Sequence, residues 1–202
     1  MIKLYHVDGS RSMRSLWLLN ELQLEYELVT MEFSMAALRT PEYLSVSPLG
    51  RVPCLQDDKL TIFESGAICQ YLCERYDSGQ LHRPPGDPDR AEWLQWLHYA
   101  ETIAVHGASL VQQTVFIAPE KRSEIVIKLE SKRLEKSLEV IDKSLKGQDY
   151  LLKSGFSAAD VAVGYSVHLA RSKIDTKGLV NVEAYHERCQ ARPAFQKSVP
   201  TI

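Results

Sequence analysis

The chain has 202 residues, enough for one large domain or two small ones whose core needs neither disulfides nor a metal. Apolar residues make up 45% and charged residues 25%, the balance of an ordinary globular protein. The 24 Lys and Arg against 26 Asp and Glu give a net charge of -2, which argues against nucleic acid as a partner, and no apolar run approaches the ~20 residues of a membrane span.

The cysteines indicate the compartment. Four are present, Cys54, Cys69, Cys73 and Cys189, without zinc-ligand spacing or a dense disulfide framework. The first residues lack the apolar stretch of a secretory signal peptide. We therefore expect reduced thiols, a cytoplasmic location and no metal site.

Residues 1–78 alternate short strands and helices, which predicts an α/β domain. Apolar patterning and turn signals predict strands over 3–7, 26–31, 52–56 and 60–63, and helices over 12–22 and 65–76, with a polar, weakly helical segment at 35–47. The order is β-α-β-α-β-β-α. Its first strand–helix–strand unit predicts a parallel pair, and its last two strands predict an antiparallel hairpin.

The composition changes after residue 78. Residues 79–88 hold three of the nine prolines and are predicted to be a linker. Beyond it the strand patterns vanish, and helical patterns cover 89–118, 120–145, 158–170 and 182–189. The sequence therefore predicts an all-helical domain over 89–202.

The turn after the first strand, residues 8–14, joins a strand end to a helix start. The N–H groups and partial positive charge of a helix N-terminus favour an anion, and a serine there can donate its hydroxyl to a thiolate or oxyanion. Ser10 and Ser12 both suit this role. Either also suits an ordinary N-cap, which the turn alone favours.

Val52-Pro53 precedes the predicted third strand. A proline that opens a strand occupies an edge or unpaired position, and an X-Pro bond is one of the few that can be cis. A cis bond would turn the N–H and C=O of Val52 outward, where an extended peptide-like ligand could pair with them. An ordinary turn is the alternative.

A second strand-to-helix junction lies at residues 63–68. The N–H and hydroxyl of Ser65 suit a carboxylate and Glu64 suits an ammonium, so one amino-acid head group could supply both charges. A plain serine cap with an acidic neighbour is the alternative. Because such junctions gather at one edge of an α/β sheet, the three motifs together predict a groove for a short peptide.

With these motifs the sequence resembles the cytosolic glutathione transferase family, most of all its serine-type bacterial or theta-like members. The resemblance spans nearly the whole chain and is carried by residues 10–14, 41–44, 50–53, 64–68, 156–160 and 191–195. It implies a thioredoxin-like N-terminal domain, an all-α C-terminal domain and a homodimer. It also implies glutathione as a cosubstrate, with no metal or organic cofactor, and a role in detoxification.

The resemblance further implies a set of glutathione-binding residues, namely Arg39, Arg51, Val52, Pro53, Glu64 and Ser65. The Val-Pro pair, with a cis bond, would bind the cysteinyl backbone, the Glu-Ser pair the γ-glutamyl end, and the arginines the glycine carboxylate. Ser10 matches the hydroxyl donor of serine-type members, and Ser12 is the alternative. Tyrosine-type members place a phenol near the end of the first strand, where this chain has His6.

The expected reaction is attack of the glutathione thiolate on a small hydrophobic electrophile. A free thiol has a pKa of about 8.5, and lowering it by about two units requires roughly 2.7 kcal/mol. A hydrogen bond to a charged acceptor supplies ~1.5–3 kcal/mol and a helix N-terminus ~0.3–1 kcal/mol, which together suffice. The electrophile is expected between the domains, against Tyr99, His106 and Gln113.

Two other functions stay open. A glutathione-dependent isomerase or peroxidase on the same fold would use the same thiolate, although Gly9-Ser10-Arg11 differs from the serine-serine-cysteine turn of maleylacetoacetate isomerases. A non-catalytic interaction module is the other alternative. Such relatives often lose the glutathione contacts, whereas the Val-Pro and Glu-Ser pairs are both present here.

Overall fold

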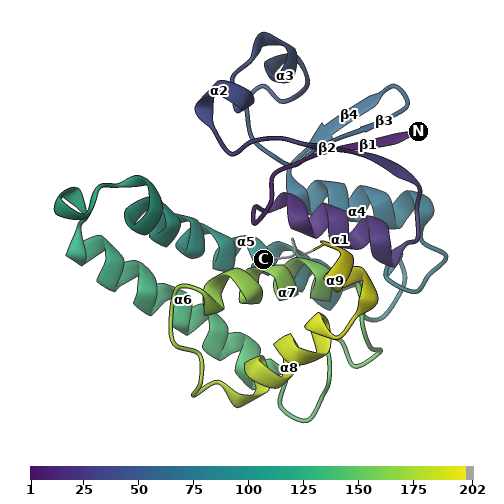
Figure 1. Cartoon of the computed structure of the whole chain (residues 1–202). Helices are drawn as coiled ribbons and strands as arrows, with labels where there is room; N and C mark the ends of the chain where they lie inside the picture. The colour runs from purple at the N-terminus through teal and green to yellow at the C-terminus, as the bar shows by residue number, and fades with distance from the viewer. Residues whose placement is uncertain (199–202) are drawn as a thin grey trace. The chain divides into compact units, whose positions relative to one another are not determined.

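A four-stranded mixed sheet organises the N-terminal part of the chain (Figure 1). The structure is a computed structural model that describes residues 1–198. β1 (Ile2–His6) pairs in parallel with β2 (Tyr26–Thr30), and α1 (Ser12–Glu21) connects them. β3 (Cys54–Asp57) lies antiparallel to β1 and forms a hairpin with β4 (Leu60–Phe63), which gives the order β2-β1-β3-β4. The predicted thioredoxin-like order is confirmed.

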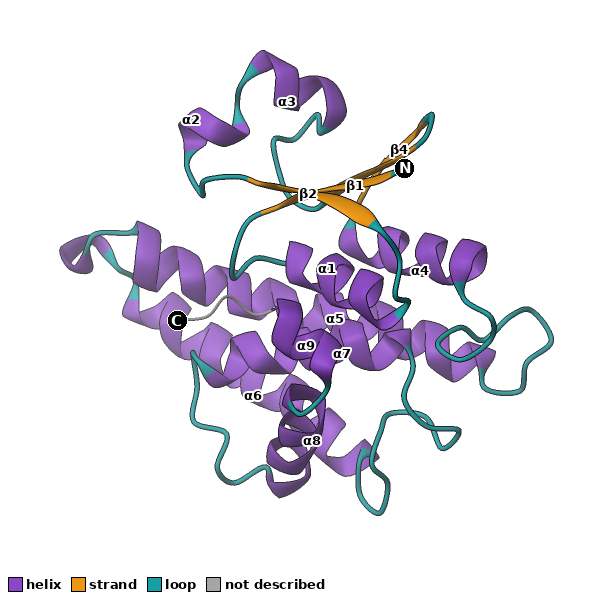
Figure 2. Ribbon diagram, turned by 45° about the vertical axis from the view of Figure 1, so that its right-hand side comes forward, coloured by secondary structure: helices purple, strands orange, loops and turns teal. Residues whose placement is uncertain are grey.

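Helices cover both faces of this sheet (Figure 2). α1 and α4 (Ser65–Tyr76) lie on one face, and the short helices α2 (Met35–Leu38) and α3 (Pro41–Val46) lie on the other. The segment predicted as weakly helical divides in two because Thr40 caps α3, accepting a hydrogen bond from the Tyr43 N–H, and Pro41 begins that helix.

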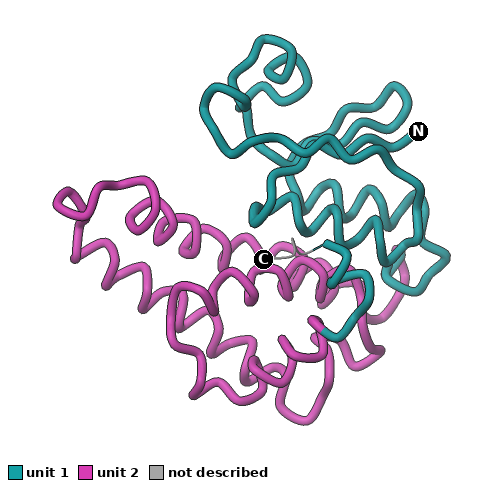
Figure 3. The backbone as a smooth tube through the Cα atoms, in the orientation of Figure 1, with its two compact units in different colours: residues 1–84, 191–202 teal, residues 85–190 magenta. Residues whose placement is uncertain are grey.

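The segment from Ala191 groups with the first unit, which comprises residues 1–84 and this C-terminal piece (Figure 3). α9 (Pro193–Ser198) packs on α1, where the Phe195 ring meets Trp17 edge-on with centroids 4.8 Å apart. Arg192 donates to both Glu21 carboxylate oxygens at 2.6 and 2.8 Å. The prediction placed all of 89–202 in the helical domain, and the structure differs there; residues 199–202 lie outside the described part.

Residues 85–190 form the helical second unit. It contains α5 (Arg90–Val111), a π-helical turn (Gln112–Phe116), a 3-10 turn (Pro119–Lys121), α6 (Glu124–Ser144), α7 (Ala158–Arg171) and α8 (Val180–Gln190). α7 is buried without interruption from Ala158 to Val167, as its apolar sequence predicts. Asp160 anchors its start in a capping box with Ser157 and also accepts the Leu151 N–H at 3.0 Å. Within residues 1–198, none of the helices is long and apolar enough to cross a bilayer.

The loop before β3 is held by an unusually close backbone approach. Gly50 has φ +57°, and a Cβ there would lie 2.3 Å from the Leu38 carbonyl oxygen. The Ser47 hydroxyl accepts the Arg51 N–H at 3.2 Å and donates to the Arg51 carbonyl at 2.8 Å, and the Tyr43 hydroxyl donates to that carbonyl at 2.7 Å. The loop therefore presents Val52 in one fixed position.

Replacing Gly50 with Ala should destabilise the protein by about 2–4 kcal/mol, because the new Cβ meets backbone and the left-handed conformation disfavours it. Denaturant unfolding measures the change. Gly178→Ala is the matched control, since a Cβ there meets nothing within 4 Å. Equal stability of the two variants would show that the loop is not constrained as described.

Candidate active site

A small cavity of about 90 Å³ opens in the first unit, where the loop before β3 faces the start of α4. We call it the cis-proline groove. Its lining residues are Arg11, Ser47, Leu49, Arg51, Val52, Pro53, Phe63, Glu64 and Ser65. Five of the six residues expected to bind glutathione therefore come together. The sixth, Arg39, is exposed and does not line the groove; its side chain lies along Gly50.

The backbone around the groove carries two unusual features. The Val52-Pro53 bond is cis, which is the conformation that the family resemblance implies and one of the two that the residues alone left open. Glu64 has φ +77° immediately before α4. This conformation costs a non-glycine residue about 1–3 kcal/mol, and residues that adopt it are found preferentially at ligand-binding and active sites. Its side chain is exposed, next to the buried Ser65.

Arg14 adds positive charge beneath the start of α4. Its guanidinium is fully buried, and its Nη1 donates to the Ser65 hydroxyl at 3.0 Å. The N-terminus of α4 carries no acidic residue in its first turn. Guanidinium and helix N-terminus together favour a carboxylate at Ser65. No local sequence pattern reveals this contact, because Arg14 and Ser65 lie 51 residues apart.

The β1–α1 turn brings four polar side chains into one chain of hydrogen bonds, which we call the junction cluster: His6, Asp8, Ser10 and Ser12. Gly9, with φ +69°, reverses the backbone between them. Asp8 Oδ1 lies 3.0 Å from His6 Nε2, His6 Nδ1 lies 2.8 Å from Ser12 Oγ, and Ser12 Oγ lies 2.7 Å from Ser10 Oγ. The chain thus runs from a carboxylate to the hydroxyl at the tip of α1.

The two serines differ in access. Ser12 is completely buried, and its Oγ also accepts the Val7 N–H at 3.1 Å, which ties β1 to α1. Ser10 is half-buried, and its Oγ accepts the Ser12 N–H at 3.2 Å. Ser10 therefore contacts the first residue of α1 and is the serine of the pair that keeps solvent exposure.

His6 is buried and its pKa is lowered, mainly by burial, while Asp8 acts in the opposite direction. At neutral pH its imidazole is therefore uncharged. An ionised Asp8 only accepts hydrogen bonds, so the His6 proton resides on Nε2 and Nδ1 is left as an acceptor.

The three residues predicted for the electrophile lie in the second unit and contact neighbouring helices or turns. The Tyr99 hydroxyl donates to the Ser137 carbonyl at 3.2 Å, His106 Nδ1 lies 2.8 Å from the Glu130 carboxylate, and Gln113 Oε1 accepts the Ser123 N–H at 2.9 Å. Each has a partner within that unit. Their predicted role stays a prediction.

The comparisons with known proteins agree on one family. Residues 1–74 match the model "Glutathione S-transferase, N-terminal domain", and residues 108–193 match "Glutathione S-transferase, C-terminal domain". Glutathione S-transferase 3 of Zea mays is 30% identical, across 100% of this chain and 94% of its own. Disulfide-bond oxidoreductase YfcG of Escherichia coli is also 30% identical, across 96% and 92%. A solved theta-class glutathione S-transferase of Xanthomonas axonopodis with glutathione bound has a TM-score of 0.87 at 27% identity, across 100% and 98%.

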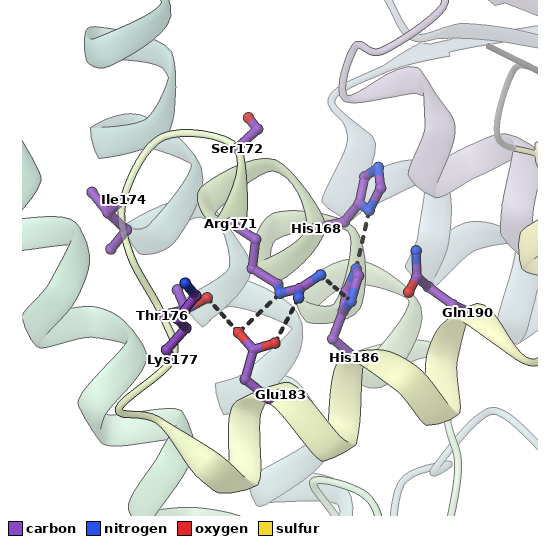
Figure 4. Close-up of a pocket in the computed structure, with 9 residues that line it drawn as sticks. All are labelled: His168, Arg171, Ser172, Ile174, Thr176, Lys177, Glu183, His186 and Gln190. Carbon is purple, nitrogen blue, oxygen red and sulfur yellow. Dashed lines mark hydrogen bonds and ion pairs between the residues drawn. The ribbon is translucent and has the colours of Figure 1, made fainter.

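A larger cavity, of about 420 Å³, lies in the second unit between the end of α7 and α8 (Figure 4). Two of its charged groups pair: Arg171 donates to both Glu183 oxygens, at 3.0 and 2.5 Å, and Thr176 donates to the same carboxylate. His186 lies between Arg171 and His168, at 2.7 and 3.0 Å. This pattern is typical of a structural network. Among residues 1–198, no cluster of three His, Cys, Asp or Glu is arranged to hold a metal.

The histidine pair makes the second unit sensitive to acid. Burial, then repulsion by Arg171 and His168, lowers the pKa of His186 from 6.5 to about 4. Between pH 6.5 and pH 4 the unfolded chain therefore binds a proton at His186 that the folded chain does not. The contribution of this group to the free energy of unfolding is fully present above pH 6.5. It is lost as the pH falls towards 4, by about 3 kcal/mol.

Urea unfolding at pH 7 and pH 4.5 measures this loss. In His186→Gln most of the loss should disappear, whereas His98→Gln, at an exposed histidine, should keep the wild-type dependence. A variant at position 186 that is as acid-sensitive as wild type would contradict the assignment.

Proposed function

The chain belongs to the cytosolic glutathione transferase family and is a glutathione transferase, and we propose that it ionises the glutathione thiol at the β1–α1 turn for attack on small hydrophobic electrophiles. The observation that carries this proposal is the half-buried Ser10 hydroxyl at the start of α1. Because its Oγ accepts the Ser12 N–H, it is placed as a hydrogen-bond donor at the positive end of a helix. One hydrogen bond to a thiolate stabilises it by about 1.5–3 kcal/mol.

Glutathione lies, in this proposal, along the cis-proline groove. The γ-glutamyl carboxylate binds at the start of α4, against Ser65, where Arg14 and the helix end supply positive charge. Glu64 binds the γ-glutamyl ammonium. The main chain of Val52 pairs with the cysteinyl backbone, and Arg51 reaches the glycine carboxylate. Arg39 does not line the groove, so its part in glycine binding has the weaker support.

The remaining expectations of the family belong to the same proposal. Tyr99, His106 and Gln113 contact the electrophile, and glutathione is consumed as a cosubstrate without a further cofactor. The protein detoxifies electrophiles in the cytoplasm as a homodimer. The four cysteines, all buried and free, support the reducing compartment.

The same thiolate could instead attack a disulfide, and the 30% identity to a disulfide-bond oxidoreductase makes this the second candidate. The two reactions differ in the leaving group, which is the electrophile's own in conjugation and a thiolate in reduction. Parallel assays with an aromatic halide and with a glutathione mixed disulfide distinguish them.

Replacing Ser10 with Ala should lower kcat for an aromatic halide about tenfold to a hundredfold, the loss of one hydrogen bond to a charged sulfur. Binding to immobilised glutathione should persist, because the groove is unchanged. Ser45→Ala, at an exposed serine of α3, is the control. Absence of glutathione binding by the wild type contradicts the proposed function, and full turnover by the Ser10 variant moves the hydroxyl role elsewhere, first to Ser12.

A further inference from the structure

The junction cluster has a defined hydrogen-bond direction. Neutral His6 donates from Nε2 to Asp8, so its Nδ1 accepts. The Ser12 hydroxyl has two acceptors in reach, His6 Nδ1 at 2.8 Å and the Val7 carbonyl at 3.2 Å, and we assign its hydrogen to the nearer one, His6. Ser12 Oγ then accepts the Val7 N–H and the Ser10 O–H. The donors therefore follow one direction, from Ser10 through Ser12 and His6 to Asp8.

We propose that His6 receives the proton that leaves the glutathione thiol, with Ser10 and Ser12 passing it inward. This rests on the proposed function, since it needs glutathione sulfur at Ser10. The S–H bond breaks as its proton moves to Ser10 Oγ, the Ser10 proton moves to Ser12 Oγ, and the Ser12 proton moves to His6 Nδ1. No oxidant or reductant takes part, and the products are a thiolate and an imidazolium.

The transfer reverses the hydrogen bonds and leaves each group satisfied. Ser12 Oγ now accepts from the Val7 N–H and His6 Nδ1–H and donates to Ser10. Ser10 Oγ accepts from the Ser12 N–H and the Ser12 hydroxyl, so its own O–H is released toward the thiolate. The same event that removes the proton thus supplies the hydrogen bond that stabilises the sulfur.

The surroundings of His6 fit a temporary positive charge. The Asp8 carboxylate stabilises the imidazolium while the thiolate is present. Its side chain is 61% exposed, so the proton leaves to water on that side only after the thiolate has reacted. On the neighbouring strand β2, Thr30 lies opposite His6. On the other side, the pairing of β1 with β3 ends at Tyr5 and Cys54, one residue before His6. Asp8 is the charged group that acts on the pKa of His6, and the thiolate becomes the second once glutathione is bound.

The sharpest test compares two quantities in the wild-type protein. The ultraviolet absorbance of bound glutathione gives the thiolate formed, and titration calorimetry in buffers of different ionisation enthalpy gives the protons released. The proposal predicts close to one thiolate per site at neutral pH with little proton release, because the proton stays on His6. One proton released per thiolate would overturn it, and glutathione that binds without forming thiolate would overturn the proposed function instead.

Variants test the path. His6→Asn keeps an amide beside Ser12 but accepts no proton, so the remaining thiolate should appear with full proton release and kcat/KM should fall about 100-fold, the low end for a positioned base. Ser12→Ala should give the same result as His6→Asn, because it removes the hydroxyl between Ser10 and His6. Ser12→Thr keeps a hydroxyl and should release as few protons as the wild type. His98→Asn, at an exposed histidine, is the control. His6 acts through the serines as a positioning residue, so an unchanged proton count in His6→Asn would contradict the proposal. If that variant does not fold, the wild-type comparison decides.

Discussion

The buried hydroxyl of Ser12 is the contact on which the chemistry of the first unit depends. It joins the Val7 backbone at the end of β1 to the start of α1, and it also meets His6 and Ser10. Because the hydroxyl has no access to water, its bonds must be made within the protein. That requirement fixes the β1–α1 turn and sets Ser10 at the tip of the helix.

The cis-proline groove likewise depends on backbone groups that are held in place, here in the loop before β3. Gly50 permits the loop to approach Leu38, and Ser47 holds both backbone groups of Arg51, so that Val52 is presented by a locked loop. At α4, Arg14 reaches Ser65 from beneath. Positive charge and oriented donors are thus built in before any ligand arrives, which reduces the reorganisation needed on binding.

Much of this could be predicted from the sequence because its signals are local. The strand and helix patterns, the Val52-Pro53 pair and the Glu64-Ser65 junction are readable from neighbouring residues, and the structure brings the two pairs into one groove. The features that could not be predicted from the sequence are long-range contacts or contacts that depend on a reversal of the backbone. α9 packs on α1 through Phe195 and Trp17, 178 residues apart, and no local pattern reveals this. The sequence identifies His6 only as the residue that stands where other members have a phenol. Its hydrogen bond to Ser12 forms because Gly9 turns the chain back.

A structure of the protein with glutathione tests the central claim most directly. The account predicts the tripeptide in the cis-proline groove, with its sulfur within hydrogen-bonding distance of Ser10 Oγ and its γ-glutamyl carboxylate at Ser65. A sulfur remote from both turn serines, or glutathione bound elsewhere with the groove empty, would contradict it.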